Sequence, residues 1–396
     1  MYINSFLSLK AYCESQKFAG WDPFDGLNSI IFQSTPLKKW YLPRLILTQA
    51  FKRNPINLRR LLLIPKEYNP KGIGLFLHGY CNLLQYSRKT GDNTLGSADE
   101  FEEKINFLAQ LLISLQSEGY SGACWGYNFD WQSRIFYQPK FTPTIVATSF
   151  CSDALFQAYN VTGDSKYRNI ALSSAQFVIN DLNHSIDSDG GIIFSYSPLD
   201  KSQVYNASLL GARLIAQCYY HKKNPDWLNI SQKAAGTIAN KQNQGGSWKY
   251  GEHHVQGWVD SFHTGYNLEC LYEIMIYSGE PLYTDSFNKG FKFYLNNFFL
   301  DNGTPKYYND RIYPIDIHSP AQFIATLAKT NKLGDNSELA RKVLKWTITH
   351  MQSSKGFFYY QINPMLSSKI PYMRWAQAWM FYAMSLYFLH KGKNGI

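Results

Sequence analysis

Apolar residues recur at helical spacing from residue 142 onward, and the helices that they predict come in pairs. The first helix of each pair is apolar on most faces, whereas the second has one apolar and one polar face. This alternation is typical of an inner and an outer ring of helices that close into a toroid. We predict inner helices over 142–160, 203–221, 261–278, 316–330 and 373–391.

Segments rich in glycine and aromatic residues separate the pairs at nearly constant spacing. With Gly190, Gly246, Gly303 and Gly356 as markers, the steps are 56, 57 and 53 residues. We predict a short β-hairpin at each marker, directly before an inner helix. All hairpins and all inner-helix N-termini should then share one face around a central funnel. The predicted hairpins lie at 122–132, 189–198, 245–252, 301–308 and 355–361.

Residues 1–120 follow this pattern less regularly than residues 121–396. Whether the segment 37–52 joins the inner ring decides between six and seven helical hairpins, and the sequence leaves this open. We predict an all-α fold, a single (α/α)6-like toroid domain over 1–396 with short β-hairpins on the active-site face. The helices expected in the first part are 2–16, 37–52, 71–88 and 98–118.

Composition adds an excess of aromatic rings and of positive charge. Aromatic residues make up 16% of the chain, which indicates an aromatic core or a cleft lined with flat rings. The net charge is +10, but Lys and Arg form no run of five or more, so no nucleic-acid partner is expected. A polyanionic sugar fits this charge at least as well.

Several features argue against other compartments and chemistries. No apolar stretch is long enough to span a membrane, and residues 1–18 lack the pattern of a signal peptide. The six cysteines form no CxxC pair, so we expect a cytoplasmic protein. His253 and His254 have no cysteine nearby, and we expect no metal and no cofactor. The aspartate-rich motifs of isoprenoid cyclases, DDxxD and DxDD, are absent.

Polar residues gather in the hairpins and in the first turns of the inner helices. Asp and His recur together at two successive helix starts, as Asp260 with His263 and Asp316 with His318. An aspartate before a helix is most often an N-cap, but capping does not call for histidine. Together with Asp130, these four are the predicted catalytic residues. The predicted substrate-binding residues are Trp125, Tyr127, Trp131, Arg134, Tyr205, Asn206, Trp258, Asn267, Gln322, Arg374, Trp375 and Gln377.

This mixture of residue types is suited to a sugar. Pyranose rings have apolar faces that lie on Trp and Tyr, and their hydroxyls require many hydrogen-bond donors and acceptors. Arg134 and Arg374 are candidates to hold a uronate carboxylate in bidentate fashion. The predicted partner is therefore a poly- or oligosaccharide, with an acidic one favoured.

Long specific strings are spread along nearly the whole chain: GWDPFDGLNS (20–29), INLRRLLLIPKEYNPKGIGLFL (56–77), CWGYNFDWQSR (124–134), FSYSPLDKSQVYNASLLGARL (194–214), WVDSFHTGYNLECLYE (258–273), YPIDIHSPAQ (313–322) and IPYMRWAQAWMF (370–381). They resemble a family of bacterial proteins encoded in exopolysaccharide and capsule clusters. Some members are labelled aminolevulinate dehydratase-like, which a toroid contradicts, because that enzyme is a β/α barrel.

The resemblance implies an α/α toroid like those of six-hairpin glycosidases, unsaturated uronyl hydrolases, polysaccharide lyases and sugar epimerases. DSFHTGYNLECL is also similar to the helix that carries the site of glucuronyl C5-epimerases. On this fold-level analogy we favour a glycoside hydrolase that acts on an acidic glycan.

Three mechanisms stay open at this point. Hydrolysis needs an acid and a second carboxylate, for which Asp130, Asp260 and Asp316 are the candidates. A uronate lyase or C5-epimerase needs a base such as His263, His318 or a tyrosinate, with an arginine near the developing negative charge. A non-catalytic glycan-binding protein would keep the aromatic residues and have less need of paired Asp and His.

Overall fold

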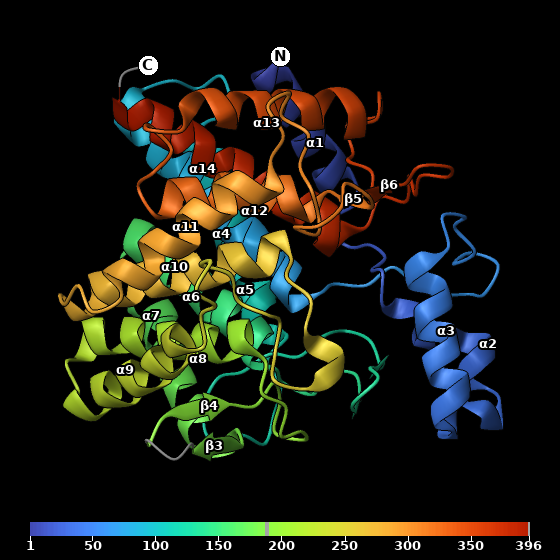
Figure 1. Cartoon of the computed structure of the whole chain (residues 1–396). Helices are drawn as coiled ribbons and strands as arrows, with labels where there is room; N and C mark the ends of the chain where they lie inside the picture. Colours follow the sequence, from blue (N-terminus) through green and yellow to red (C-terminus); the bar gives the residue numbers. More distant parts are fainter. Residues whose placement is uncertain (187–189, 395–396) are drawn as a thin grey trace.

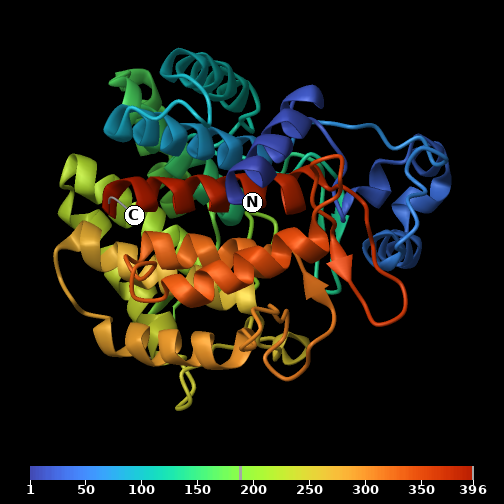
Figure 2. The same ribbon diagram turned by 90° about the horizontal axis from the view of Figure 1, so that it is seen from above.

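Six helices stand side by side and form a closed inner ring (Figures 1 and 2). The structure is a computed structural model, and it describes residues 1–186 and 190–394. Each inner helix packs against the next, and the last packs against the first. They are α4 (Pro70–Thr90), α6 (Ile145–Thr162), α8 (Tyr205–Lys222), α10 (Ser261–Ser278), α12 (His318–Lys329) and α14 (Trp379–Asn394).

An outer helix precedes each inner helix in the described chain. The first of them, α1, contacts α13 and α14, so the two ends of the chain meet where the ring closes. The outer helices are α1 (Tyr2–Ser15), α5 (Ala98–Ser114), α7 (Ser165–Gln176), α9 (Pro225–Asn240), α11 (Thr284–Phe298) and α13 (Ser337–Met351). The predicted all-α toroid is confirmed.

The segment 37–52 does not enter the ring. It contains α3 (Tyr41–Arg53), which stands apart from the ring together with α2 (Ile30–Gln33) and the 3-10 turn Pro36–Lys39 (Figure 1). In the part of the chain that the structure describes, the ring therefore has six helical hairpins and no seventh. The sequence left that choice open.

Burial distinguishes the two rings. The inner helix α6 is buried along almost its whole length, whereas the outer helix α13 buries one stripe that runs from Ala340 to Met351. Thr144 caps α6 by accepting the backbone N–H of Ala147 on its hydroxyl. Gly163, with φ of +76°, ends the helix in the left-handed conformation.

The recurrent glycines have a common structural reason. After four of the outer helices, a glycine turns the chain inward while touching the backbone of the next outer helix. A Cβ atom at any of the four would come within 1.9 to 2.5 Å of that backbone, so only glycine fits. The contacts are Gly122 with Ser173, Gly246 with Lys289, Gly303 with Lys342 and Gly356 with Ser8.

The predicted hairpins are only partly paired. The strands β1 (Trp131–Gln132) and β2 (Tyr137–Gln138) form one small sheet, and β3 (His184–Ile186) and β4 (Ile192–Phe194) form another. Residue 189 of the predicted hairpin 189–198 lies outside the described residues.

Elsewhere the prediction of hairpins was wrong. The segments 245–252 and 301–308 contain tight turns with isolated bridges and no strands of their own. The strands β5 (Ile315–Asp316) and β6 (Gln361–Ile362) come from two successive loops and pair with each other. Two further short segments, Phe177–Asp181 and Met373–Ala378, are π-helices, and Asp25–Asn28 and His254–Gln256 are 3-10 turns. No helix among the described residues has the length and apolarity needed to cross a membrane.

Candidate active site

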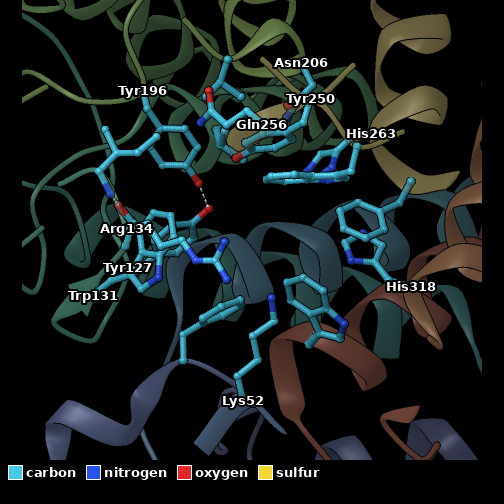
Figure 3. A pocket seen from close by; sticks show the side chains of 18 of the residues that line it. Lys52, Tyr127, Trp131, Arg134, Tyr196, Asn206, Tyr250, Gln256, His263 and His318 are labelled. Atoms are coloured by element: carbon cyan, nitrogen blue, oxygen red, sulfur yellow. Dashed lines mark hydrogen bonds between the residues drawn. The ribbon is translucent and has the colours of Figure 1, made fainter. Parts of the chain in front are cut away.

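A cavity of about 360 Å³ opens where the inner helices begin, and α3 forms part of its rim (Figure 3). Its lining is dominated by aromatic rings and contains several cations. The predicted site residues that line it are Tyr127, Trp131, Arg134, Asn206, Trp258, His263, His318, Arg374 and Trp375. The toroid thus brings together residues that are up to 248 positions apart in the sequence.

No carboxylate belongs to the described lining of this cavity. This corrects the prediction of three aspartates open to a substrate. Asp130 lies outside the lining and accepts the backbone N–H of Lys140 at 2.7 Å and the amide of Gln33 at 3.2 Å. Asp260 and Asp316 are only 2% and 0% exposed. Both are committed to hydrogen bonds that fix neighbouring groups.

His263 is oriented by the aspartate that begins its helix. Asp260 caps α10, because its Oδ1 accepts the backbone N–H of His263 at 3.0 Å. Its Oδ2 lies 2.7 Å from Nδ1 of the same residue and accepts the indole N–H of Trp258 at 2.9 Å. Since the carboxylate accepts the Nδ1 proton, Nε2 of His263 is the nitrogen left for the cavity (Figure 3).

A second aspartate holds the start of α12. Asp316 accepts the backbone N–H of His318 at 2.9 Å and the indole N–H of Trp375 at 2.8 Å, both on Oδ1. The Gln361 amide donates to Oδ2 at 2.6 Å. Burial raises the pKa of Asp316 to about 6, although these three hydrogen bonds lower it. Both aspartates therefore bind a histidine amide and an indole, but only Asp260 also contacts the imidazole.

The imidazole of His318 belongs instead to a chain of three side chains. Its Nε2 lies 2.8 Å from the Tyr266 hydroxyl, to which Nζ of Lys71 donates at 3.3 Å. Because Lys71 donates to this hydroxyl, the Tyr266 proton points to His318. Burial lowers the pKa of both His318 and Lys71 well below their usual ranges, and neighbouring cations add to the effect. The His318 imidazole is therefore neutral.

Stacked rings form the walls. Tyr250 lies on Trp258 with the ring centroids 4.5 Å apart, and Tyr127 lies on Phe129 at 5.3 Å. The Tyr127 and Tyr196 hydroxyls are 3.0 Å apart, which joins two loops across one side of the cavity (Figure 3). Flat rings of this kind at a cavity wall present apolar faces to a ligand.

Positive charge reaches the cavity in two forms. Arg374 is bound by Asp22, because its Nε and Nη2 donate to Oδ2 and Oδ1 at 2.6 and 2.8 Å. The predicted bidentate grip of Arg374 on a uronate is thus corrected, since Asp22 occupies it. Lys52 and Arg134 line the cavity and have no carboxylate at ion-pair distance among the described residues. Burial lowers the pKa of Lys52, although Asp316 raises it.

Five predicted substrate-binding residues lie outside the cavity lining. Trp125 is fully buried and donates its indole N–H to the Leu112 carbonyl at 2.8 Å, which is a core role. Gln377 uses its amide to hold the backbone of Phe358, at 2.8 Å in both directions. The other three are buried inside the ring at 0 to 2% exposure: Tyr205, Asn267 and Gln322.

Four residues in or behind the cavity wall were not singled out from the sequence, namely Tyr266, Lys52, Asp22 and Tyr250. Tyr266 lies one helical turn after His263, so the spacing i, i+3 on α10 could have found it. Lys52 and Asp22 lie in the irregular first part of the chain, and Tyr250 lies in a loop. No local signal in the sequence places these three at the funnel.

Comparison with known proteins places the fold. No protein-family model matches the chain, and no curated protein matches it. A sugar epimerase from a ruminal bacterium superposes with a TM-score of 0.63 at 11% identity, over 84% of this chain and 90% of that one. The cellobiose 2-epimerase of Bacillus thermoamylovorans B4167 gives 0.61 at 13%, over 82% and 88%. An unsaturated glucuronyl hydrolase specific for heparin gives 0.61 at 13%, over 98% and 96%.

These similarities show the fold. The chain shares the α/α toroid of two sugar epimerases and an unsaturated glucuronyl hydrolase. At 11 to 13% identity the likeness extends to the fold alone. Membership of the exopolysaccharide-cluster family stays a prediction.

Proposed function

We propose that this protein is a carbohydrate-active enzyme that epimerises or isomerises an acidic sugar by moving a proton on carbon. The observation that carries the proposal is the lining of the cavity, which presents two histidines and six tyrosines but, among the described residues, no carboxylate. Hydrolysis through paired carboxylates needs both of them within reach of the scissile bond. Proton transfer needs a base with a pKa near neutral, and histidine is suited to this role.

His263 is the base in this proposal. Its Nε2 is available to the cavity, while Asp260 holds Nδ1 and stabilises the imidazolium that forms when a proton is taken up. The C–H bond next to a carbonyl or carboxylate of the sugar breaks, its proton goes to Nε2, and the electron pair moves onto the oxygen as an enolate. Lys52 and Arg134, which line the cavity, stabilise this negative charge.

Tyr266 returns the proton. Its O–H proton, which is directed at His318 at rest, passes to the enolate, and the tyrosinate left behind accepts the hydrogen bond of Lys71. After release of the product, Tyr266 takes a proton from solvent and His263 loses the one it had taken up. Delivery to the same carbon from the other side inverts the centre, and delivery to the neighbouring carbon isomerises the sugar. His263 and His318 flank Phe262, with ring centroids 4.2 and 4.4 Å from it, so the base and the donor chain approach one substrate from different directions.

The charges favour an acidic sugar. Lys52 and Arg134 reach the cavity without a carboxylate partner among the described residues, and a uronate group would supply one. The stacked rings of Tyr250 and Trp258 offer a platform for the apolar face of a pyranose. The epimerases among the structural neighbours support the reaction class, and the glucuronyl hydrolase supports the substrate class.

The test is incubation of the protein in heavy water with uronate-containing oligosaccharides and, in parallel, with neutral reducing disaccharides. We expect deuterium to enter the uronate without chain cleavage, as seen by mass spectrometry and NMR. H263Q should lower the exchange rate by ~10²–10⁴, because the base is lost while the ring volume is nearly kept. H350Q, at an exposed histidine of α13, is the matched control and should leave the rate unchanged.

Three results would overturn the proposal. New reducing ends without deuterium at carbon would mean hydrolysis, and the ultraviolet absorbance of an unsaturated sugar would mean elimination. Exchange that survives in H263Q would remove His263 from the role of base. Exchange into the neutral disaccharide alone would keep the proton transfer and refute the acidic substrate.

A further inference from the structure

Residues 30–64 form a lobe that stands beside the ring, which we call the α3 lobe (Figures 1 and 2). It is tied to the ring side by polar contacts. Arg44 donates to the Gln132 side chain at 3.0 Å, and buried Arg59 pairs with Asp25 at 2.7 Å. These contacts leave many side chains of the lobe exposed.

The exposed surface of the α3 lobe is strongly apolar. Ten of the 25 exposed large apolar side chains among the described residues belong to it, although it is 35 residues long. On α3, Leu42 and Ile46 are 63% and 65% exposed and lie one turn apart on one face. Trp40, directly before the helix, is 59% exposed. Such a concentration on one protrusion marks an interaction surface.

The same lobe carries most of the net charge of the protein. It contains seven basic residues and no acidic one, because no Asp or Glu occurs between Asp25 and Glu67. The whole chain has a net charge of +10. Lys38, Lys39 and Arg53 are exposed beside the apolar face. The surface thus combines aromatic and aliphatic side chains with unopposed positive charge.

We infer that the α3 lobe docks on an anionic lipid surface. Apolar side chains that project between headgroups, an exposed Trp–Tyr pair and a rim of lysines are the features by which proteins bind the bilayer interface without crossing it. A protein partner would need an acidic, apolar patch of matching shape, and a second copy of this lobe would meet it with like charge. A flat anionic bilayer satisfies both the charge and the protruding shape.

The docking surface and the cavity share one helix. Gln49 and Arg53 of α3 line the cavity, and the exposed Leu42 and Ile46 lie on the same face of the helix, one to three turns nearer its N-terminus. A membrane bound by the lobe would therefore lie next to the cavity rim. The reaction would take place beside the bilayer, where a carbohydrate attached to a lipid is within reach. Docking itself does not depend on the proposed reaction.

The test is co-sedimentation of the full-length protein with two kinds of vesicle, one of phosphatidylcholine alone and one with about 30 mol% phosphatidylglycerol. The second kind has a negative surface of the sort that attracts basic segments of proteins. We expect binding to the anionic vesicles only, and weaker binding as salt rises. The triple variant W40S/L42S/I46S should lower the partition coefficient at least ~tenfold. The pair K38Q/K39Q should also lower it about tenfold or more.

The matched control is M365S/L366S, which removes two exposed apolar side chains, 97% and 60% exposed, outside the lobe. It should bind vesicles like the wild type, and all variants should keep the wild-type melting temperature. Absence of binding to anionic vesicles at low salt would overturn the inference, and so would equal loss in the control. Light scattering that shows a dimer abolished by the triple variant would assign the surface to a second copy instead.

Discussion

The N-terminal end and the centre of the inner ring are built from the same six helices, but among the described residues some charged side chains lack a carboxylate partner at the first, and those at the second are paired. At the N-terminal end, Lys52 and Arg134 reach the cavity with no carboxylate at ion-pair distance among the described residues. About 12 to 18 Å further along the helices, at 1.5 Å per residue, the barrel centre is filled by ionisable groups that are all paired. The paired residues are His78, Asp153, Arg213, Glu273 and Lys329, each from a different inner helix.

This second region is a closed network. Asp153 lies 3.2 Å from Nζ of Lys329 and 3.4 Å from Nη1 of Arg213, and Glu273 contacts the same two cations at 3.0 Å. Burial alone would raise the pKa of Asp153, but Lys329 and Arg213 hold it well below its usual range. Two carboxylates thus balance two cations inside the ring.

The contrast shows how one scaffold separates stability from binding. Paired charges fill the centre of the barrel and offer no free charge to a ligand. Charges that lack a partner beside a cavity are stabilised only when a ligand supplies one. The predictions below test this separation, from the largest expected effect to the smallest.

Removing one member of the paired network should destabilise the protein strongly. D153N keeps the shape of the side chain but leaves Arg213 and Lys329 with excess buried charge. We expect the free energy of unfolding to fall by about 3–5 kcal/mol, measured by urea denaturation. D335N, at an exposed residue 4.0 Å from Lys332, is the control and should change it by less than about 0.5 kcal/mol. A small effect of D153N would show that the stability of the barrel does not depend on this network.

Glu269 lies on α10 between the two regions and should make stability depend on pH. Burial raises the pKa of its carboxyl to about 7, while it accepts hydrogen bonds from Gln322 and Thr326. In the unfolded chain the pKa returns to about 4.3. Between these values the folded state binds more protons, so this group lowers stability as pH rises from about 4.3 to 7.

E269Q removes the titration. We expect the variant to gain about 2–3 kcal/mol relative to the wild type between pH 4.5 and pH 8, from unfolding curves at both values. E280Q, at an exposed glutamate just after α10, should show no such change. A difference between E269Q and wild type that is the same at both pH values would refute the raised pKa.

The smallest effect is expected for Lys52, a charged residue at the cavity that lacks a carboxylate partner among the described residues. K52Q should weaken binding of a uronate oligosaccharide about tenfold, measured by calorimetry, and leave the unfolding free energy unchanged. K89Q, near the C-terminal end of α4, is the control and should bind normally. Loss of stability in K52Q together with normal binding would reverse the assignment of this lysine.

The helices and the ring could be predicted from the sequence because their causes are local and repeated. Apolar spacing predicts each inner helix, and three of the four glycine markers, Gly246, Gly303 and Gly356, report turns that leave no room for a side chain. Asp and His recur together at two helix starts in the sequence. In the structure, the aspartate at each of these starts binds the backbone amide of the histidine and the indole of a tryptophan.

The direction of individual side chains could not be predicted in this way. Asp130, Asp260 and Asp316 belong to the right loops, but whether a carboxylate faces a cavity or a backbone amide depends on contacts from distant segments. Asp22 meets Arg374 across 352 positions, and no periodicity relates them. The α3 lobe interrupts the repeat, so its contribution of Lys52 to the rim has no signal in the pattern of apolar residues.

The contact between Gly356 and Ser8 has a consequence for how the protein is made. The hydroxyl of Ser5 donates to the Gln352 side chain at 2.6 Å across 347 positions, so α1 can meet α13 only after residue 352 has been made. Before that, α1 can contact α4 and α5, through Glu14 with Tyr80 and Lys10 with Glu100. Closure of this joint is a non-local event that follows the local pairing of helices. We therefore expect the nascent protein to leave the ribosome as an open crescent, and chaperones to meet it in that form.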